Sequence, residues 1–121
     1  MRAFFLVAAL AAFSPLSALA NGYETIRDKS TFLSVVAGKE LRIGLYNLSL
    51  NLTPDGKITG RALGWGITGT WQWKDGYFCR NMDWSGSLIP YNCQLVEVRD
   101  NREIRFTSDK GAGDSASLRL R

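Results

Sequence analysis

The chain has 121 residues and no histidine, so it lacks the side chain that most often serves as the base in nucleophilic catalysis. Its two cysteines are too few to complete a tetrahedral metal site. Like charges form no run, and no basic stripe indicates a nucleic-acid partner. These absences predict a protein without a metal, without a cofactor and without a nucleic-acid partner.

Residues 1–20 have the organisation of a secretory signal peptide. Arg2 is followed by an uncharged run of 11 apolar residues, which is too short to cross about 30 Å of hydrocarbon as a helix. Ala18 and Ala20 are small residues at the positions that a signal peptidase reads. We expect a cleaved signal peptide, a mature protein that begins at Asn21 without a membrane span, and a location in the periplasm or outside the cell.

The remaining part, residues 21–121, is long enough for one domain with one modest core. Once Arg2 is removed, 14 basic and 11 acidic side chains remain, a mildly cationic balance of +3. An even number of cysteines in an exported protein indicates a disulfide, so we expect Cys79 and Cys93 to be linked.

One short helix is expected near the start of this domain. Its apolar side chains recur at the helical spacing i, i+3 and i+4: Phe32, Val35 and Val36. Asp28 or Ser30 can cap its N-terminus, and Gly38 stands where a left-handed residue ends a helix. The chain after Lys39 has the patterns of strands and turns.

The first hairpin is expected around the turn at 53–56, where each residue of TPDG favours a turn conformation. The leucines at 48, 50 and 52 alternate with polar residues, which places them on one face of a strand. The chain returns over 57–63. Glycine weakens a regular strand, so we interpret the glycines at 60, 64, 66 and 69 as bulges or sharp bends.

A second hairpin is expected at Asp75-Gly76, a dipeptide typical of two-residue turns. This turn sets three pairs opposite each other on one face: Trp73 with Phe78, Trp71 with Arg80, and Gly69 with Met82. Cys79 then lies on the other face, beside Gln72.

A third hairpin is expected to turn at 100–102. This three-residue loop pairs apolar residues across two strands: Val98 with Ile104 and Val96 with Phe106. A two-residue loop would instead set both valines opposite charged side chains. With the longer loop, Cys93 lies on the face opposite the valines, as Cys79 does in its own hairpin. We therefore expect the disulfide to join neighbouring strands on their less apolar face.

A last strand is expected over Ser115–Leu120, after a glycine-containing loop at 110–114. The domain is thus predicted to be mainly β, an antiparallel up-and-down meander of seven or eight short strands with one short N-terminal helix. Such a meander has to close or fold over to hide its edges. We predict a lipocalin-like small barrel, with a β-sandwich as the alternative, and eight strands leave room for side chains or one small ligand.

Aromatic side chains supply the candidates for a binding site. Trp71, Trp73 and Phe78 have the alternation of core residues, where large rings fill space. Trp65 and Trp84 lie at predicted strand ends among glycines, and we interpret them as part of an exposed binding rim. Three residues of the 110–114 loop complete this candidate rim: Gly111, Gly113 and Asp114.

Two pairs of acidic residues have the composition that a hydrolase with two carboxylates needs. Asp75 and Asp83 flank a turn and a strand end, and Asp109 and Asp114 bracket a glycine-containing loop. Solvation and turn chemistry account for both pairs, so we assign no catalytic residue.

Five segments carry a resemblance to a known family: FLSVVAGKELR, LTPDGKITGRALG, ITGTWQWKDGYFCR, YNCQLVEV and SDKGAGDSASLRLR. Through them the stretch from Thr31 to Arg121 resembles a family of short exported bacterial proteins of uncharacterised function. Members of this family often carry the automatic label dihydrodipicolinate reductase. The resemblance supplies no catalytic or binding residues.

Two classes of function follow. The first is a non-enzymatic binding or interaction module for an unknown protein or small-molecule partner. The second is an enzyme of unrecognised type, including the reductase that the resemblance names. A nicotinamide-dependent reductase usually holds its cofactor with G-x-G-x-x-G between a strand and a helix. Segment 111–116 has only the first two glycines and leads into a predicted strand, so we expect the binding module.

Overall fold

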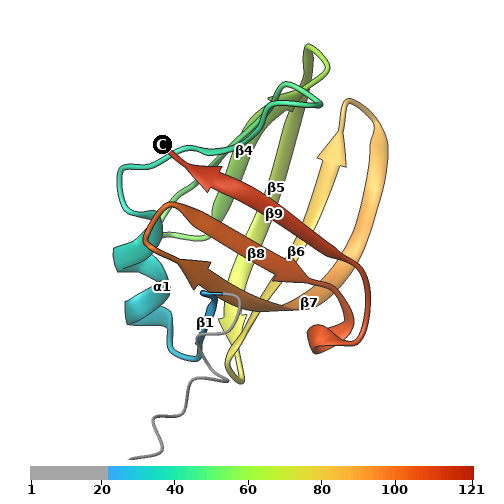
Figure 1. Cartoon of the computed structure of the whole chain (residues 1–121). Helices are drawn as coiled ribbons and strands as arrows, with labels where there is room; N and C mark the ends of the chain where they lie inside the picture. The colour runs from blue at the N-terminus through green and yellow to red at the C-terminus, as the bar shows by residue number, and fades with distance from the viewer. Residues whose placement is uncertain (1–21) are drawn as a thin grey trace, which may run out of the picture.

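The computed structural model describes residues 22–121, which form a closed antiparallel barrel of eight strands with one α-helix (Figure 1). The predicted signal peptide at 1–20 and the predicted mature N-terminus at Asn21 lie outside the described residues. The barrel strands are β2 (Leu41–Ile43), β3 (Leu48–Leu52), β4 (Lys57–Ala62), β5 (Trp65–Lys74), β6 (Tyr77–Trp84), β7 (Ser87–Arg99), β8 (Glu103–Thr107) and β9 (Ser115–Leu120). Each pairs with the next and β9 pairs with β2, so the predicted small barrel is confirmed in place of the sandwich.

The second and third hairpins have the registers that their turns predict. Trp73 lies opposite Phe78 across the β5–β6 turn, and Val98 lies opposite Ile104 across the β7–β8 loop. Phe78 and Ile104 are buried, so the apolar face of each hairpin points into the barrel. The alternation of side chains along a strand then turns the opposite face outward.

One strand lies outside the ring. β1 (Glu24–Ile26) pairs with the second half of β7, and its residue Ile26 is buried. The neighbouring Tyr23 lies between two cations, with its ring centre 4.6 Å from Cζ of Arg99 and 4.0 Å from Cζ of Arg105. The sequence patterns do not predict β1, because three residues are too few to show a period of two.

The helix α1 (Lys29–Val36) lies across one end of the barrel (Figure 1). Of the two predicted caps, Asp28 is the one used: its Oδ2 accepts a hydrogen bond from the backbone N of Thr31 at 3.3 Å. The Ser30 hydroxyl donates to the same carboxylate at 2.7 Å. Gly38 has a φ of +66°, as expected of the residue that ends a helix.

An aromatic cluster fills the barrel beneath α1. The buried ring of Phe32 has its centre 5.4 Å from that of Trp71, 4.9 Å from Trp73 and 5.3 Å from Phe78. Nε1 of Trp71 donates to the carbonyl oxygen of Thr53 at 3.0 Å, so the polar atom of this buried ring is satisfied. We call this packed end of the barrel the closed end; it carries α1 and the connections at 53–56, 75–76 and 100–102.

Gly60 and Gly69 do not mark bulges, one of the two interpretations of these glycines. Both lie within regular strand pairs that show no shift in register. A Cβ at Gly60 would clash with the carbonyl oxygen of Ser49, and one at Gly69 with that of Asn81, so both glycines permit close approach of a neighbouring strand. The shift in register occurs instead between β6 and β7, directly after Arg80.

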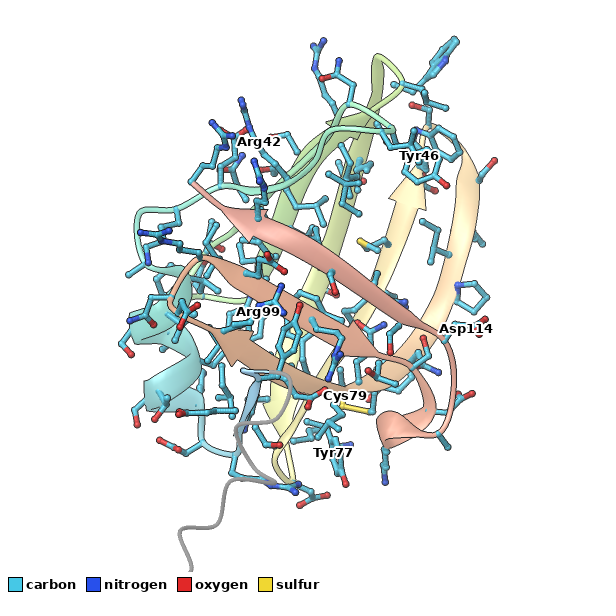
Figure 2. All side chains as sticks on the ribbon, viewed as in Figure 1. Arg42, Tyr46, Tyr77, Cys79, Arg99 and Asp114 are labelled. Atoms are coloured by element: carbon cyan, nitrogen blue, oxygen red, sulfur yellow. A yellow bond between two sulfur atoms is a disulfide. The ribbon has the colours of Figure 1, made fainter. Side chains whose placement is uncertain are left out.

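The disulfide joins Cys79 of β6 to Cys93 of β7, which lie directly opposite each other with their Cα atoms 3.9 Å apart (Figure 2). Because Phe78 points into the barrel, its neighbour Cys79 points outward, as the alternation predicts. The Tyr91 hydroxyl lies 3.4 Å from Sγ of Cys93. The bridge therefore fixes the β6–β7 pair immediately before its register shifts.

Candidate ligand-binding site

Apolar side chains surround a cavity inside the barrel, beyond the aromatic cluster. Its volume is about 170 Å³, and eleven of the thirteen residues that line it are apolar: Leu41, Ile43, Leu48, Leu50, Leu52, Ile58, Phe78, Met82, Phe106, Ala116 and Leu118. A protein cavity of about 150 Å³ lined by such side chains is large enough to bind benzene. The cavity therefore has the size and the polarity to hold a small apolar group.

The cavity opens where β2 and β9 separate. These strands pair over only two positions, 41–42 with 119–120. Ala116 lies on β9 two residues before the buried Leu118, so its side chain faces the interior, yet Ala116 is exposed. An inward-facing residue that reaches solvent means that the interior is open at this point, which we call the mouth.

Two polar side chains also line the cavity, Arg80 and Gln94. Nη1 of Arg80 donates to the carbonyl oxygen of Pro90 at 2.7 Å, and Nε2 of Gln94 donates to Oγ of Ser108 at 3.4 Å. Burial lowers the pKa of the Arg80 guanidinium from its usual value. Among residues 22–121, no carboxylate forms an ion pair with Arg80. The cavity is thus apolar with one positive charge in its wall.

Large apolar side chains are exposed at the end of the barrel opposite α1. Because neighbouring strands run in opposite directions, the β2–β3, β4–β5 and β6–β7 connections all lie at this end (Figure 1). The backbone N of Leu63 donates to the carbonyl oxygen of Tyr46 at 2.9 Å, which ties two of these connections together. We call the exposed residues here the apolar rim: Leu45, Tyr46, Leu63, Trp65 and Leu88.

The structure brings the two candidate tryptophans together. Trp65 is 64 % exposed, whereas Trp84 is partly buried and donates from Nε1 to the carbonyl oxygen of Ala62 at 3.1 Å. Both line one groove with Ser85 and Ser87. Of the two, Trp65 is the one that presents its ring to solvent.

The other candidate rim residues lie in the exposed connection between β8 and β9: Gly111, Gly113 and Asp114. This connection contains the 3-10 turn η2 (Asp109–Gly111) and is fixed to β7 by Asn92, whose Nδ2 donates to Oδ1 of Asp109 at 2.8 Å. The backbone N of Asp109 donates in return to Oδ1 of Asn92 at 2.9 Å. Figure 2 shows Asp114 well apart from Tyr46, and none of the three residues lines the tryptophan groove or the cavity.

The acidic pairs considered from the sequence serve local structure. Asp75 lies in the β5–β6 turn, while Asp83 lies near the other end of β6 and accepts a hydrogen bond from the backbone N of Gly86 at 2.7 Å. Asp109 is bound to Asn92 as described above. Within residues 22–121, no three acidic or cysteine side chains gather into a group that could hold a metal ion.

Arg80 is a site residue that sequence reasoning did not single out. The predicted hairpin register already sets Arg80 opposite Trp71 on the apolar face, and the structure has the same pair. A charged residue at an inward position of a small barrel is the signal that could have identified it, because buried charges are rare unless they are paired.

Comparison of the chain with protein-family models, with curated proteins and with solved structures finds no match. In the described part of the chain, no helix has the length and apolar character needed to cross a membrane.

Proposed function

We propose that this protein is a non-enzymatic binding module that holds a small apolar molecule inside its barrel. The observation that carries the proposal is the cavity of about 170 Å³, lined almost entirely by apolar side chains and open at the mouth. Drug-sized ligands occupy pockets of about 300–1,000 Å³, so a cavity of this size suits a single ring or a short alkyl chain. The inward-facing, exposed Ala116 marks the route by which such a group would enter.

The apolar rim supports the same proposal. Leu45 is 82 % exposed and Leu88 is 80 % exposed, although both are large aliphatic residues. Large apolar side chains exposed together at one end of a small protein are a candidate interaction site. We propose that part of a bound molecule too long for the cavity lies over this rim, with Trp65 and Trp84 as the first aromatic contacts.

We also propose that the protein works in the periplasm or outside the cell. The Cys79–Cys93 bridge supports this location, because disulfides persist mainly in oxidising compartments. The intact mass of the native protein tests it: we expect a chain that begins at Asn21. A native mass that includes residues 1–20 would contradict the proposed export.

Binding in the cavity is tested by titrating the oxidised protein, residues 21–121, with 1-hexanol while the methyl resonances are followed by NMR. We expect saturable shifts at methyl groups of the cavity wall, such as those of Ile58 and Leu118, and smaller shifts at the exposed Leu45. The variant Ala116→Phe places a ring in the mouth and should weaken binding at least tenfold.

The matched control is Ala37→Phe, the same substitution at an exposed residue directly after α1. This variant should bind 1-hexanol as the unmodified protein does. Equal loss of binding in both variants, or shifts confined to surface methyls, would contradict a ligand site in the barrel.

A further inference from the structure

Arg80 is placed where a charge is unusual, on the inward face of β6 between the apolar residues Phe78 and Met82 of the cavity wall. The pairing of β6 with β7 shifts directly after Arg80, and the facing stretch of β7 contains Pro90, which has no backbone N–H to donate. Within residues 22–121, the carbonyl oxygen of Pro90 accepts the one hydrogen bond that the guanidinium donates. In this part of the chain, the charge of this cavity-lining residue therefore has a single partner, which is neutral.

A guanidinium has five N–H donors, arranged as a planar fork that fits the two oxygens of a carboxylate. At Arg80, one donor is used by the Pro90 carbonyl, and among the described residues no carboxylate lies within 4.0 Å. Burial without a nearby negative charge accounts for the lowered pKa of this group. Arg80 is half-buried, and a partly desolvated charge without a counter-charge is unfavourable, so an anion beside Arg80 would be stabilised.

The rest of the cavity wall favours an apolar group instead of an anion. Its remaining wall is apolar apart from Gln94, whose amide N–H already donates to Ser108. A molecule that satisfies both parts of the wall needs an anionic end and an apolar body. We propose that the ligand is a carboxylate amphiphile whose head group pairs with Arg80 while its hydrocarbon part fills the cavity. This inference rests on the proposed binding in the barrel and names the chemical class of the ligand.

Three probes with the same eight-carbon chain test this proposal: octanoate, 1-octanol and protonated octylamine, each titrated calorimetrically into the oxidised protein at neutral pH. A hydrogen-bonded charge pair corresponds to about a tenfold to hundredfold gain in affinity. We expect octanoate to bind at least tenfold more tightly than 1-octanol, and octylamine to bind most weakly. This comparison needs no variant and so does not depend on the folding of a mutant.

Arg80→Met removes the charge and keeps a long apolar side chain. We expect it to abolish the preference for octanoate over 1-octanol, whereas a purely structural role would weaken both ligands alike and keep their affinity ratio. Arg80→Lys keeps the charge and loses the fork, so it should retain only part of the preference for octanoate. The matched control Arg61→Met removes an exposed, outward-facing charge and should change neither affinity.

The outcomes separate this inference from the function on which it rests. Binding of neither octanoate nor 1-octanol would overturn the proposed binding in the barrel. Equal binding of both to the unmodified protein would leave the barrel site standing and overturn the role of Arg80. A preference for octanoate that survives in Arg80→Met would place the anion elsewhere and equally contradict the proposal.

Discussion

The two ends of the barrel carry similar apolar side chains, which are packed at one end and exposed at the other. At the closed end, Phe32 from α1 packs into a cluster of three aromatic rings, and the indole N–H of Trp71 is bonded to a backbone carbonyl. At the opposite end, leucine, tyrosine and tryptophan side chains are exposed, and the interior beside the mouth holds a cavity.

We therefore expect the closed end to supply most of the stability and the opposite end to carry the proposed binding site. Burial of apolar surface and close packing stabilise a domain, and both are concentrated where α1 covers the barrel. A cavity and exposed apolar side chains contribute little to stability, but they are what a ligand for an apolar site needs. We therefore expect the same substitution to lower the free energy of unfolding more at the closed end than at the opposite end.

The largest difference in the free energy of unfolding is expected between alanine substitutions at two tryptophans, Trp71 and Trp65. Trp71→Ala removes a ring that is 5 % exposed, and it should lower the free energy of unfolding by about 3–5 kcal/mol. Trp65→Ala removes a ring that is mostly exposed and should change it by no more than about 0.5 kcal/mol. Urea unfolding of both variants measures the contrast, and similar losses at the two positions would mean that both ends of the barrel are packed alike.

The disulfide lies between the two ends, and its loss should have the next largest effect. Cys79 and Cys93 are 14 residues apart, and cross-links that close loops of this length stabilise proteins by about 3 kcal/mol through the unfolded chain. The double variant Cys79→Ala/Cys93→Ala should lose a stability of this order in urea unfolding. A reductant should lower the stability of the unmodified protein and leave that of the double variant unchanged.

Two glycines of β5, Gly69 and Gly66, differ in the space that is available for an added Cβ atom. A Cβ at Gly69 would clash with the backbone of β6, so Gly69→Ala should cost about 1–3 kcal/mol of unfolding free energy through overpacking. A Cβ at Gly66, near the rim, meets no atom within 4 Å. Gly66→Ala should therefore be tolerated, and a larger loss there than at Gly69 would contradict the described strand packing.

The smallest effect on stability is expected when low pH protonates the Asp28 carboxylate, which caps the N-terminus of α1. The hydroxyl of Ser30 and then that of Thr31 donate to the Asp28 carboxylate and lower its pKa below the ordinary value of 3.8. A carboxyl group whose pKa is lower in the folded than in the unfolded chain makes its full contribution to stability at pH values above the unfolded-state pKa. Its contribution is lost as the pH falls through the folded-state pKa.

Asp28→Asn keeps a side-chain oxygen at the cap and removes the titration. Unfolding midpoints measured from neutral to strongly acidic pH should therefore fall less steeply for Asp28→Asn than for the unmodified protein. Parallel curves for the two proteins would show that the cap does not contribute to acid sensitivity at the closed end.

Local signals in the sequence predicted most of the barrel. A two-residue turn at Asp75-Gly76 fixes which residues face each other, and alternation then decides which face each side chain occupies. The same reasoning placed Cys79 and Cys93 on corresponding faces before their strands were known to be neighbours. These predictions succeeded because hairpin register depends on residues close together in the chain.

The features that form the candidate site depend on distant contacts, and local patterns did not reveal them. The mouth exists because β2 and β9 pair over only two positions. The number of paired positions depends on two strands far apart in the chain, so no short segment of the sequence predicts it. The volume of the cavity depends on side chains from most of the strands. Trp65 and Trp84 line one groove, but the β8–β9 connection with the other candidate rim residues binds to β7 instead of joining them.

The position of the C-terminus has a practical consequence. Arg121 exchanges two backbone hydrogen bonds with Glu40, just after α1, so the last residue is held on the closed side of the barrel (Figure 1). A protein tethered to a sensor surface through a C-terminal tag would therefore turn the mouth and the apolar rim toward the solution. Such an immobilised sample offers the candidate site to dissolved molecules without obstruction by the tether.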